Sequence, residues 1–286
     1  MTMISAQDER SPFSSQWLGT LDLTFGAAQG ETFIRHSHVK APLKVQRPFF
    51  PEGAGVCHSV ILHTAGGVVG GDRLLLNLDL QADAQALITT AAAAKIYRSN
   101  GQAAQQCLQV RLGANACLEW LPQETIVFEQ AQYQQQMRID LAPGATWLGW
   151  EITRLGRTAR QERFYAGNWR SRTEVWQGDR PLWIDRQWLP GSEATWHSPH
   201  GLAACPVVGT FALVGRPIEA DVVASIRETW TGQAGQAGVT RLASGLLCRY
   251  RGHSTTEVRQ WFIQVWEITR SHFQQRPICI PRVWQL

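Results

Sequence analysis

A glycine-rich segment is the pattern in this chain that most resembles a ligand-binding loop. The segment HTAGGVVGGDR, residues 63–73, holds four glycines within six positions and continues directly into Asp72. The spacing of Gly66 and Gly71 equals that of a nucleotide-binding phosphate loop, but Asp72 and Arg73 replace the lysine and hydroxyl residue which that loop needs. A carboxylate repels phosphate, and an alternating strand pattern follows in place of a helix whose N-terminal amides hold an anion. The segment therefore argues against nucleotide binding and predicts a tight turn.

The carboxylate of Asp72 is the strongest candidate for chemistry in this segment. If strand geometry begins at Asp72, its side chain shares a face with the alternating leucines of residues 74–80 and points inward. An inward carboxylate costs roughly several kcal/mol unless it is paired, hydrated or bound to metal. Two interpretations stay open. One is an ion pair with a cation such as Arg73 or Arg98, or a capped turn; the other is a functional carboxylate that lines a wet cavity or an ion path.

Two histidine patterns could contribute metal ligands. His36 and His38 would lie about 7 Å apart on one face of a strand, which suits two ligands of one ion. His197 and His200 lie close in sequence to Cys205. Spacing identifies no further ligand for either pattern, so both metal-site hypotheses are weak.

Other reactive side chains form no recognisable catalytic pattern. Five carboxylates stand among apolar residues, but spacing pairs none of them: Glu119, Glu124, Glu151, Glu162 and Asp185. A G-x-S-x-G nucleophile motif is absent. The six cysteines include no C-x-x-C pair, which is typical of small buried thiols. We therefore predict that the chain is not an enzyme.

Composition narrows the classes of partner. The chain has 286 residues and a net charge of +4, and its Lys and Arg residues are scattered. Scattered cations argue against nucleic acid or an anionic membrane as a partner. The N-terminal residues lack the apolar run of a signal peptide, and no apolar stretch of about 18 residues occurs. We therefore expect a cytoplasmic protein. Its 13 tryptophans belong either in a core or in contact surfaces.

The elements that position these residues follow a period of two from residue 21 to about 210. Residues 74–80, 108–112 and 137–141 alternate apolar and polar side chains, as half-buried strands do. Related turn sequences close these strands at 80–84, 112–116 and 141–145, about 30 residues apart. Repeats of two strands and two turns predict a mainly β fold, built of stacked hairpins or of β-helical, solenoid-like coils.

The pattern changes after residue 216. Pro217 and the two acidic residues that follow predict a helix start, residues 232–238 a flexible break, and residues 241–249 a strand. The sequence S-T-T-E at 254–257 predicts a reciprocal cap for a second helix with aromatic residues at helical spacing. We predict one domain over 1–286, with a β-rich body over 17–215 and a helix–strand–helix and tail over 216–286.

Several ordered motifs together resemble one family, the urease accessory proteins UreD, called UreH in some bacteria. They span most of the chain and are far more specific than the glycine cluster alone. The motifs are HVKAPLKVQRPFFP at 38–51, HTAGGVVGGD at 63–72, LITT at 87–90, KIYRS at 95–99, LEWLPQETI at 118–126, Gly156-Arg157 with Glu162 and Phe164, and PRVW at 281–284.

The resemblance implies a mainly β, β-helical fold with two helices in the C-terminal third. It also implies a non-enzymatic role in urease maturation: a scaffold that acts with UreF and the GTPase UreG on apo-urease, and a dimer of heterodimers with UreF. Nickel would be in transit along a water-filled passage, with no tightly bound cofactor. Under this resemblance Asp72 is the first candidate for a passage carboxylate and Asp185 the second.

Departures from the family pattern and one rival hypothesis complete the analysis. The alanines at 91–94 replace more polar family residues, so a ligand from that segment would be absent, and His36 is not part of the pattern. The aromatic C-terminal third could either contact UreF or pack onto the β body. The rival is a Trp-rich β-solenoid that binds carbohydrate or cleaves polysaccharide, although the carboxylate pair which such cleavage needs is not evident.

Overall fold

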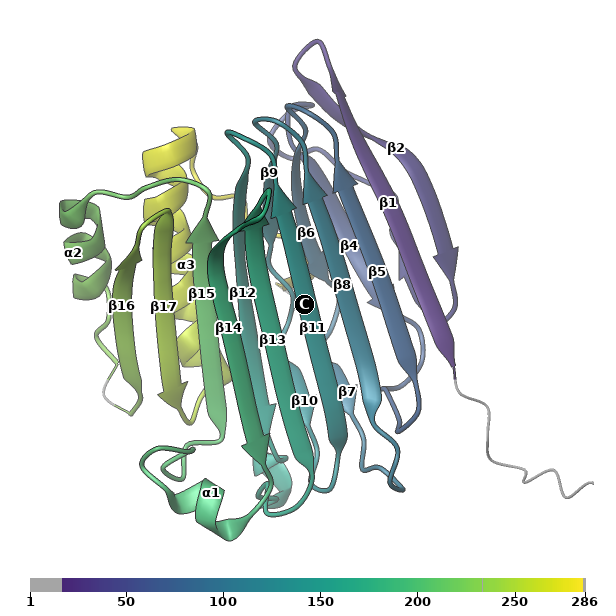
Figure 1. Ribbon diagram of the computed structural model, residues 1–286, viewed down its shortest axis with the longest axis vertical. Coiled ribbons are helices and arrows are strands. Elements are labelled where there is room, and N and C mark those ends of the chain that lie inside the picture. The colour runs from purple at the N-terminus through teal and green to yellow at the C-terminus, as the bar shows by residue number, and fades with distance from the viewer. Residues whose placement is uncertain (1–16, 233, 285–286) are drawn as a thin grey trace, which may run out of the picture.

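The structure, a computed structural model, describes residues 17–232 and 234–284. Two stacked β-sheets form its body, and helices lie against one of them (Figure 1). The seven-stranded sheet consists, in spatial order, of β14 (Arg180–Pro190), β13 (Asn168–Gln177), β11 (Gln132–Leu141), β8 (Ala104–Leu112), β5 (Arg73–Leu80), β1 (Leu18–Ala28) and β2 (Glu31–Lys40).

The ten-stranded sheet lies behind the first in the view of Figure 1. Its order is β16 (Gln236–Leu242), β17 (Gly245–Gly252), β15 (Val207–Val214), β12 (Thr146–Leu155), β9 (Cys117–Trp120), β6 (Gln85–Thr90), β4 (Cys57–His63) and β3 (Leu43–Val45). The short β10 (Thr125–Val127) pairs with β12 and with β7 (Ala94–Ile96).

The chain alternates between the two sheets and so winds a β-solenoid of about four turns. Parallel pairing stacks β5, β8 and β11 in one sheet and β6, β9 and β12 in the other. Leu80 pairs with Leu112, and Leu112 with Leu141, so the ends of successive coils are in register. The predicted β-helical fold class is therefore confirmed.

The turns that close these coils have the predicted backbone conformation. Asp83, Asn115 and Gly144 occupy equivalent positions and have φ angles of 63°, 58° and 76°. Asn115 donates a side-chain hydrogen bond to Asp83 at 3.1 Å, which links one turn to the next. Because Asp, Asn and Gly tolerate the left-handed region better than other residues, the repeated turn sequence selects this geometry.

Three helices accompany the strands: α1 (Glu193–His197), α2 (Ala220–Glu228) and α3 (Thr255–Gln274), with single 3-10 turns at Thr158–Arg160 and Arg282–Trp284. The two longer helices lie in the C-terminal third, as predicted. The apolar side of α3, which includes Trp261, Phe262 and Trp266, is buried against the outer side of the ten-stranded sheet. That sheet is therefore covered on both faces, and the near-continuous apolar sequence of β12 is typical of such a strand.

The cap of α3 differs in part from its prediction. Ser254 Oγ accepts a hydrogen bond from the amide of Glu257 at 3.1 Å, as expected. The Glu257 carboxylate does not return to the Ser254 amide; it accepts a hydrogen bond from the Tyr250 hydroxyl at 2.6 Å. The Ser254 amide contacts that same hydroxyl at 3.4 Å. A tyrosine of β17 thus takes one half of the capping box, because its hydroxyl reaches both groups.

The segment before α3 is a hairpin, which corrects the prediction of a single strand over 241–249. β16 and β17 pair in antiparallel order around Ala243 and Ser244. The predicted break over 232–238 is also too long, because β16 begins at Gln236. A seven-residue glycine-containing strand at the sheet edge carries too weak an alternation to be recognised from sequence.

Candidate functional site

A cavity of about 570 Å³ lies between the two sheets, inside the solenoid. The glycine-rich segment contributes one wall through His63, Gly66, Gly67 and Val68. The alanines at 91–94 form another part of the lining, and Ala92 and Lys95 are exposed at its mouth. These alanines offer no ligand, in agreement with the departure noted from the sequence. The polar groups that face the cavity include Gln106, Gln135, Thr125, Thr153 and Glu151.

Glu151 is the carboxylate of this cavity. It lies on the face of β12 that Trp147 and Leu155 turn toward the seven-stranded sheet, so it occupies the place of an apolar core residue. Ser171 Oγ of β13 donates a hydrogen bond to Oε2 at 3.2 Å, and the Gln135 amide of β11 donates to Oε1. Strands from three different parts of the chain therefore position one carboxylate.

Burial raises the pKa of Glu151 to about 7. The Ser171 hydrogen bond opposes this shift, the negative charge of Asp185 adds to it, and Gln135 and Arg249 oppose it. A carboxyl group with this pKa exchanges protons near neutral pH, which is the property of a group that can release a proton when a cation arrives. Glu151 was one of five carboxylates noted in the sequence, but spacing did not distinguish it.

Asp185 lies beside this cavity, on the inward side of β14. Its Oδ1 accepts a hydrogen bond from Arg249 Nη2 at 2.5 Å, and its Oδ2 accepts one from Gln187 at 2.8 Å. Arg249 also donates to Thr210 Oγ1 at 2.7 Å. The guanidinium group balances the charge of Asp185, whereas Glu151 has no ion pair in the described part of the chain. The structure thus places the second sequence candidate next to an unpaired carboxylate.

Asp72 is buried, as the sequence predicted, but its carboxylate has a local partner. Only 5% of the residue is exposed, against 4% for Leu74 and for Leu76 on the same face. Oδ2 accepts a hydrogen bond from the Val69 amide at 3.0 Å, and the Asp72 amide donates to the Val69 carbonyl at 3.1 Å. Asp72 therefore caps the turn whose other residues line the cavity; Asp72 itself is not among the lining residues.

The two histidine patterns do not form metal sites in the structure. His36 and His38 lie on the exposed edge strand β2, where His38 Nδ1 is 3.3 Å from Asp22 Oδ2. Cys205 Sγ lies 3.7 Å from His253 Nε2. Within residues 17–232 and 234–284, no group of three or more His, Cys, Asp or Glu side chains could hold a metal ion.

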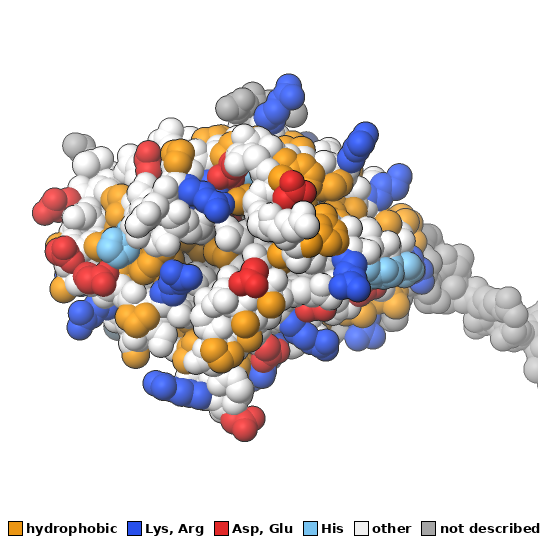
Figure 2. Space-filling view, turned by 90° about the horizontal axis from the view of Figure 1, so that it is seen from above, with side chains coloured by type: hydrophobic (Ala, Val, Ile, Leu, Met, Phe, Trp, Pro, Cys, Tyr) orange, Lys and Arg blue, Asp and Glu red, His pale blue; other side chains and the backbone are white. Residues whose placement is uncertain are grey.

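The surface offers few aromatic side chains to a ligand. Of the tryptophans, Trp17 and Trp188 are the exposed ones in the described residues. On the face in Figure 2, basic and acidic side chains are interspersed and no field of one sign dominates. No helix in the part of the chain that the structure describes is long and apolar enough to span a bilayer. These two tryptophans lie far apart in the fold, so they do not form a row of aromatic residues that could bind carbohydrate.

Fold and cavity together define the class of protein: a two-sheet β-solenoid with a cavity between the sheets that several polar groups and one carboxylate help to line. Comparison of the sequence with known families and proteins then identifies its relatives. The profile of the family "UreD urease accessory protein" matches residues 18–285. The chain therefore belongs to the UreD family of urease accessory proteins. The rival hypothesis of a carbohydrate-active protein is thereby set aside.

Relatives with the name "Urease accessory protein UreD" match nearly the whole chain. The protein from Nostoc sp. is 60% identical over 269 residues, which cover 94% of this chain and 96% of the relative. The protein from Nostoc punctiforme is 59% identical over 276 residues, 96% of this chain and 99% of the relative. The Synechocystis protein is 43% identical over 258 residues, 89% and 96% of the two chains. Membership indicates an accessory role toward urease.

Proposed function

We propose that this protein delivers nickel to apo-urease and that the ion passes through the cavity between the two sheets. The observation that carries the proposal is the unpaired carboxylate of Glu151 at the wall of that cavity. Carboxylate, amide and hydroxyl oxygens bind Ni²⁺ more weakly than several imidazoles do. Weak sites suit a conduit, because an ion has to leave each site as well as enter it.

Under this proposal, Glu151 exchanges its proton for the ion. The protonated carboxyl is the favoured form in a buried site, since burial penalises the charged form. An arriving dication would displace that proton and restore the carboxylate. Asp185, which is paired with Arg249, would offer the next carboxylate. Asp72, at the head of the turn that forms the cavity wall, stays a third candidate for contact with the ion.

The proposal includes the partners UreF and UreG, a dimer of heterodimers with UreF, and action in the cytoplasm. The aromatic side of α3 packs onto the sheet, so a UreF contact in the C-terminal third would use the outward surface of α2 and α3. A groove between these helices includes Val222, Ile268 and His272. Val222 and Ile268 are half-buried beside charged side chains, which is typical of the margin of a protein–protein interface.

The experiment that tests this function reconstitutes urease activation. Tagged protein is incubated with purified UreF, UreG, apo-urease and limiting nickel, and the nickel bound to urease is counted. We expect retention of UreF and apo-urease on the tagged protein and a strong dependence of urease nickel content on its presence. Absence of both retention and dependence would overturn the proposal.

A further inference from the structure

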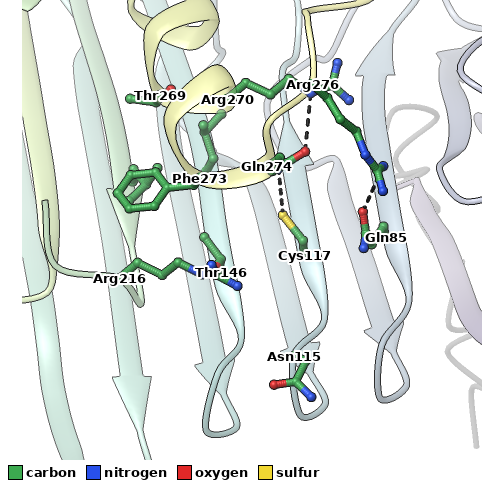
Figure 3. A pocket seen from close by; sticks show the side chains of 12 residues that line it. Gln85, Asn115, Cys117, Thr146, Arg216, Thr269, Arg270, Phe273, Gln274 and Arg276 are labelled. Atoms are coloured by element: carbon green, nitrogen blue, oxygen red, sulfur yellow. Dashed lines mark hydrogen bonds between the residues drawn. The ribbon is translucent and has the colours of Figure 1, made fainter. Parts of the chain in front are cut away.

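A second, smaller cavity lies on the outer side of the ten-stranded sheet, beneath the C-terminal end of α3 (Figure 3). Its volume is about 210 Å³. The floor consists of Gln85, Cys117 and Thr146, which are the first residues of β6, β9 and β12 and pair in register. The three side chains therefore form a ladder across successive coils, with neighbours about 4.8 Å apart.

The roof comes from residues outside the coils, and each floor residue bonds to one of them. Three hydrogen bonds join roof to floor: Arg276 Nη1 to Gln85 Oε1 at 3.1 Å, Gln274 Nε2 to Cys117 Sγ at 3.2 Å, and Arg216 Nε to Thr146 Oγ1 at 2.9 Å. The cavity is thus built by side chains that are already held in place, and it requires no rearrangement to form.

Three guanidinium groups converge on this cavity, from Arg216, Arg270 and Arg276. Arg270 is compensated by buried carboxylates: it contacts Glu52 at 2.7 Å and Glu119 at 3.2 Å. Arg216 and Arg276 form no ion pair with a carboxylate anywhere in residues 17–232 and 234–284. The lining contains no acidic side chain. Two unneutralised cations therefore face one small space.

The positive charges of the three arginines all act on Cys117, the middle residue of the floor. Burial and the negative charge of Glu119 raise the pKa of the Cys117 thiol to about 12, although Arg216, Arg270 and Arg276 all oppose this shift. All three arginines thus act on the same sulfur atom. The carbonyl end of α3 contributes only about half an elementary negative charge, which is less than the two uncompensated cations.

The shape and donors of the cavity select the class of ligand. Arginine presents forked N–H donors that match the oxygen pairs of phosphate and carboxylate, and these charge-assisted bonds are the strong ones. The volume of about 210 Å³ admits a phosphate with part of its hydration shell.

We propose that this cavity binds a small, doubly charged oxyanion such as phosphate between Arg216 and Arg276. The anion would relieve the repulsion between the two guanidinium groups and fasten the segment after α3 to three coils of the solenoid. This site is independent of the nickel cavity, because it lies on the opposite face of the ten-stranded sheet.

Thermal unfolding of the full chain in phosphate and in chloride at equal ionic strength tests the proposal. Phosphate at ten times its Kd is expected to raise Tm by about 3 °C above the chloride value. The double variant Arg216→Gln/Arg276→Gln is expected to lose this rise. Arg241→Gln, which changes an exposed arginine of β16, is the matched control and is expected to keep it.

Calorimetric titration measures the site directly and does not depend on the stability of the variants. Phosphate and sulfate are expected to bind the wild-type chain and the control with one site each, and the double variant at least tenfold more weakly. A rise in Tm that is the same in chloride, or equal binding by the double variant, would overturn the proposal. Equal affinity for acetate would overturn the assignment to doubly charged oxyanions.

Discussion

At the scale of single residues, the account depends on which carboxylates line the cavity and which are enclosed by neighbouring backbone. Asp72 is buried in the solenoid and Glu151 is half-buried, but Glu151 faces a cavity and Asp72 accepts a hydrogen bond from the Val69 amide. Burial alone therefore does not define a functional carboxylate. What separates the two residues is that Glu151 lines the cavity, whereas Asp72 does not.

The raised pKa of Glu151 predicts a dependence of stability on pH. A carboxyl whose folded pKa, about 7, exceeds its ordinary value of 4.5 stays protonated in the folded state while the unfolded chain ionises. The contribution of Glu151 to the free energy of unfolding therefore falls as pH rises from about 4.5 through 7, by about 3 kcal/mol. Glu151→Gln removes this loss. Urea unfolding is expected to show the variant gaining stability over the wild type between pH 5 and pH 8; a constant difference would refute the assignment.

Asp72 can be tested by two substitutions that separate its structural role from a role in transport. Asp72→Ala removes the acceptor of the partly buried hydrogen bond from the Val69 amide and is expected to cost about 1 kcal/mol of stability. Asp72→Asn keeps an acceptor oxygen but removes the charge. If Asp72 contacts nickel, the Asn variant keeps its Tm and loses urease activation at limiting nickel. Normal activation by the Asn variant would show that Asp72 only caps the turn and does not contact nickel.

Sequence reasoning reached Asp72 and Asp185 but could not single out Glu151. The sequence of β12 is apolar on both faces, so alternation does not reveal which way Glu151 points. Its partners, Gln135 and Ser171, lie on other strands, and only the stacking of coils brings them together. The one available signal is a glutamate within an apolar run, which implies a buried charge that needs an explanation.

At the scale of elements, the strands were more predictable than the segments that connect them to the helices. The repeated turns could be predicted from the sequence because each has a residue that tolerates positive φ at the same position, as Asp83 and Asn115 do. The β16–β17 hairpin was missed, since its edge strand includes a glycine and few buried side chains. The cap of α3 includes Tyr250, and only tertiary packing brings the Tyr250 hydroxyl to the Glu257 carboxylate.

The arrangement of α2 and α3 predicts where UreF binds. Ile268 lies in the groove between the two helices, so Ile268→Arg would place a charge in the proposed contact. We expect retention of UreF to fall at least tenfold, which corresponds to about 1.4 kcal/mol. Ile184→Arg, at an exposed position of β14, is the control. Comparable retention by both variants, at unchanged Tm, would place the contact elsewhere.

At the scale of the whole molecule, the solenoid brings polar side chains together, although its described residues form no metal-binding cluster. Coils stack their backbones in register, so polar side chains at equivalent positions meet in the interior without any sequence motif. The same stacking builds the arginine-roofed cavity on the outer side of the ten-stranded sheet. The mainly β class followed from the repeats, whereas neither cavity could be derived from them.

The most direct measurement of the central claim is the nickel content of urease after activation by the complete set of accessory proteins at limiting nickel. The compared chains are the wild type, Glu151→Gln and the control Asp140→Asn, whose carboxylate lies on the outward face of β11 and pairs with Arg138. We expect Glu151→Gln to reduce nickel per urease at least tenfold while UreF and apo-urease stay bound, and the control to match the wild type. Equal nickel content with Glu151→Gln and with the wild type would contradict passage through the cavity.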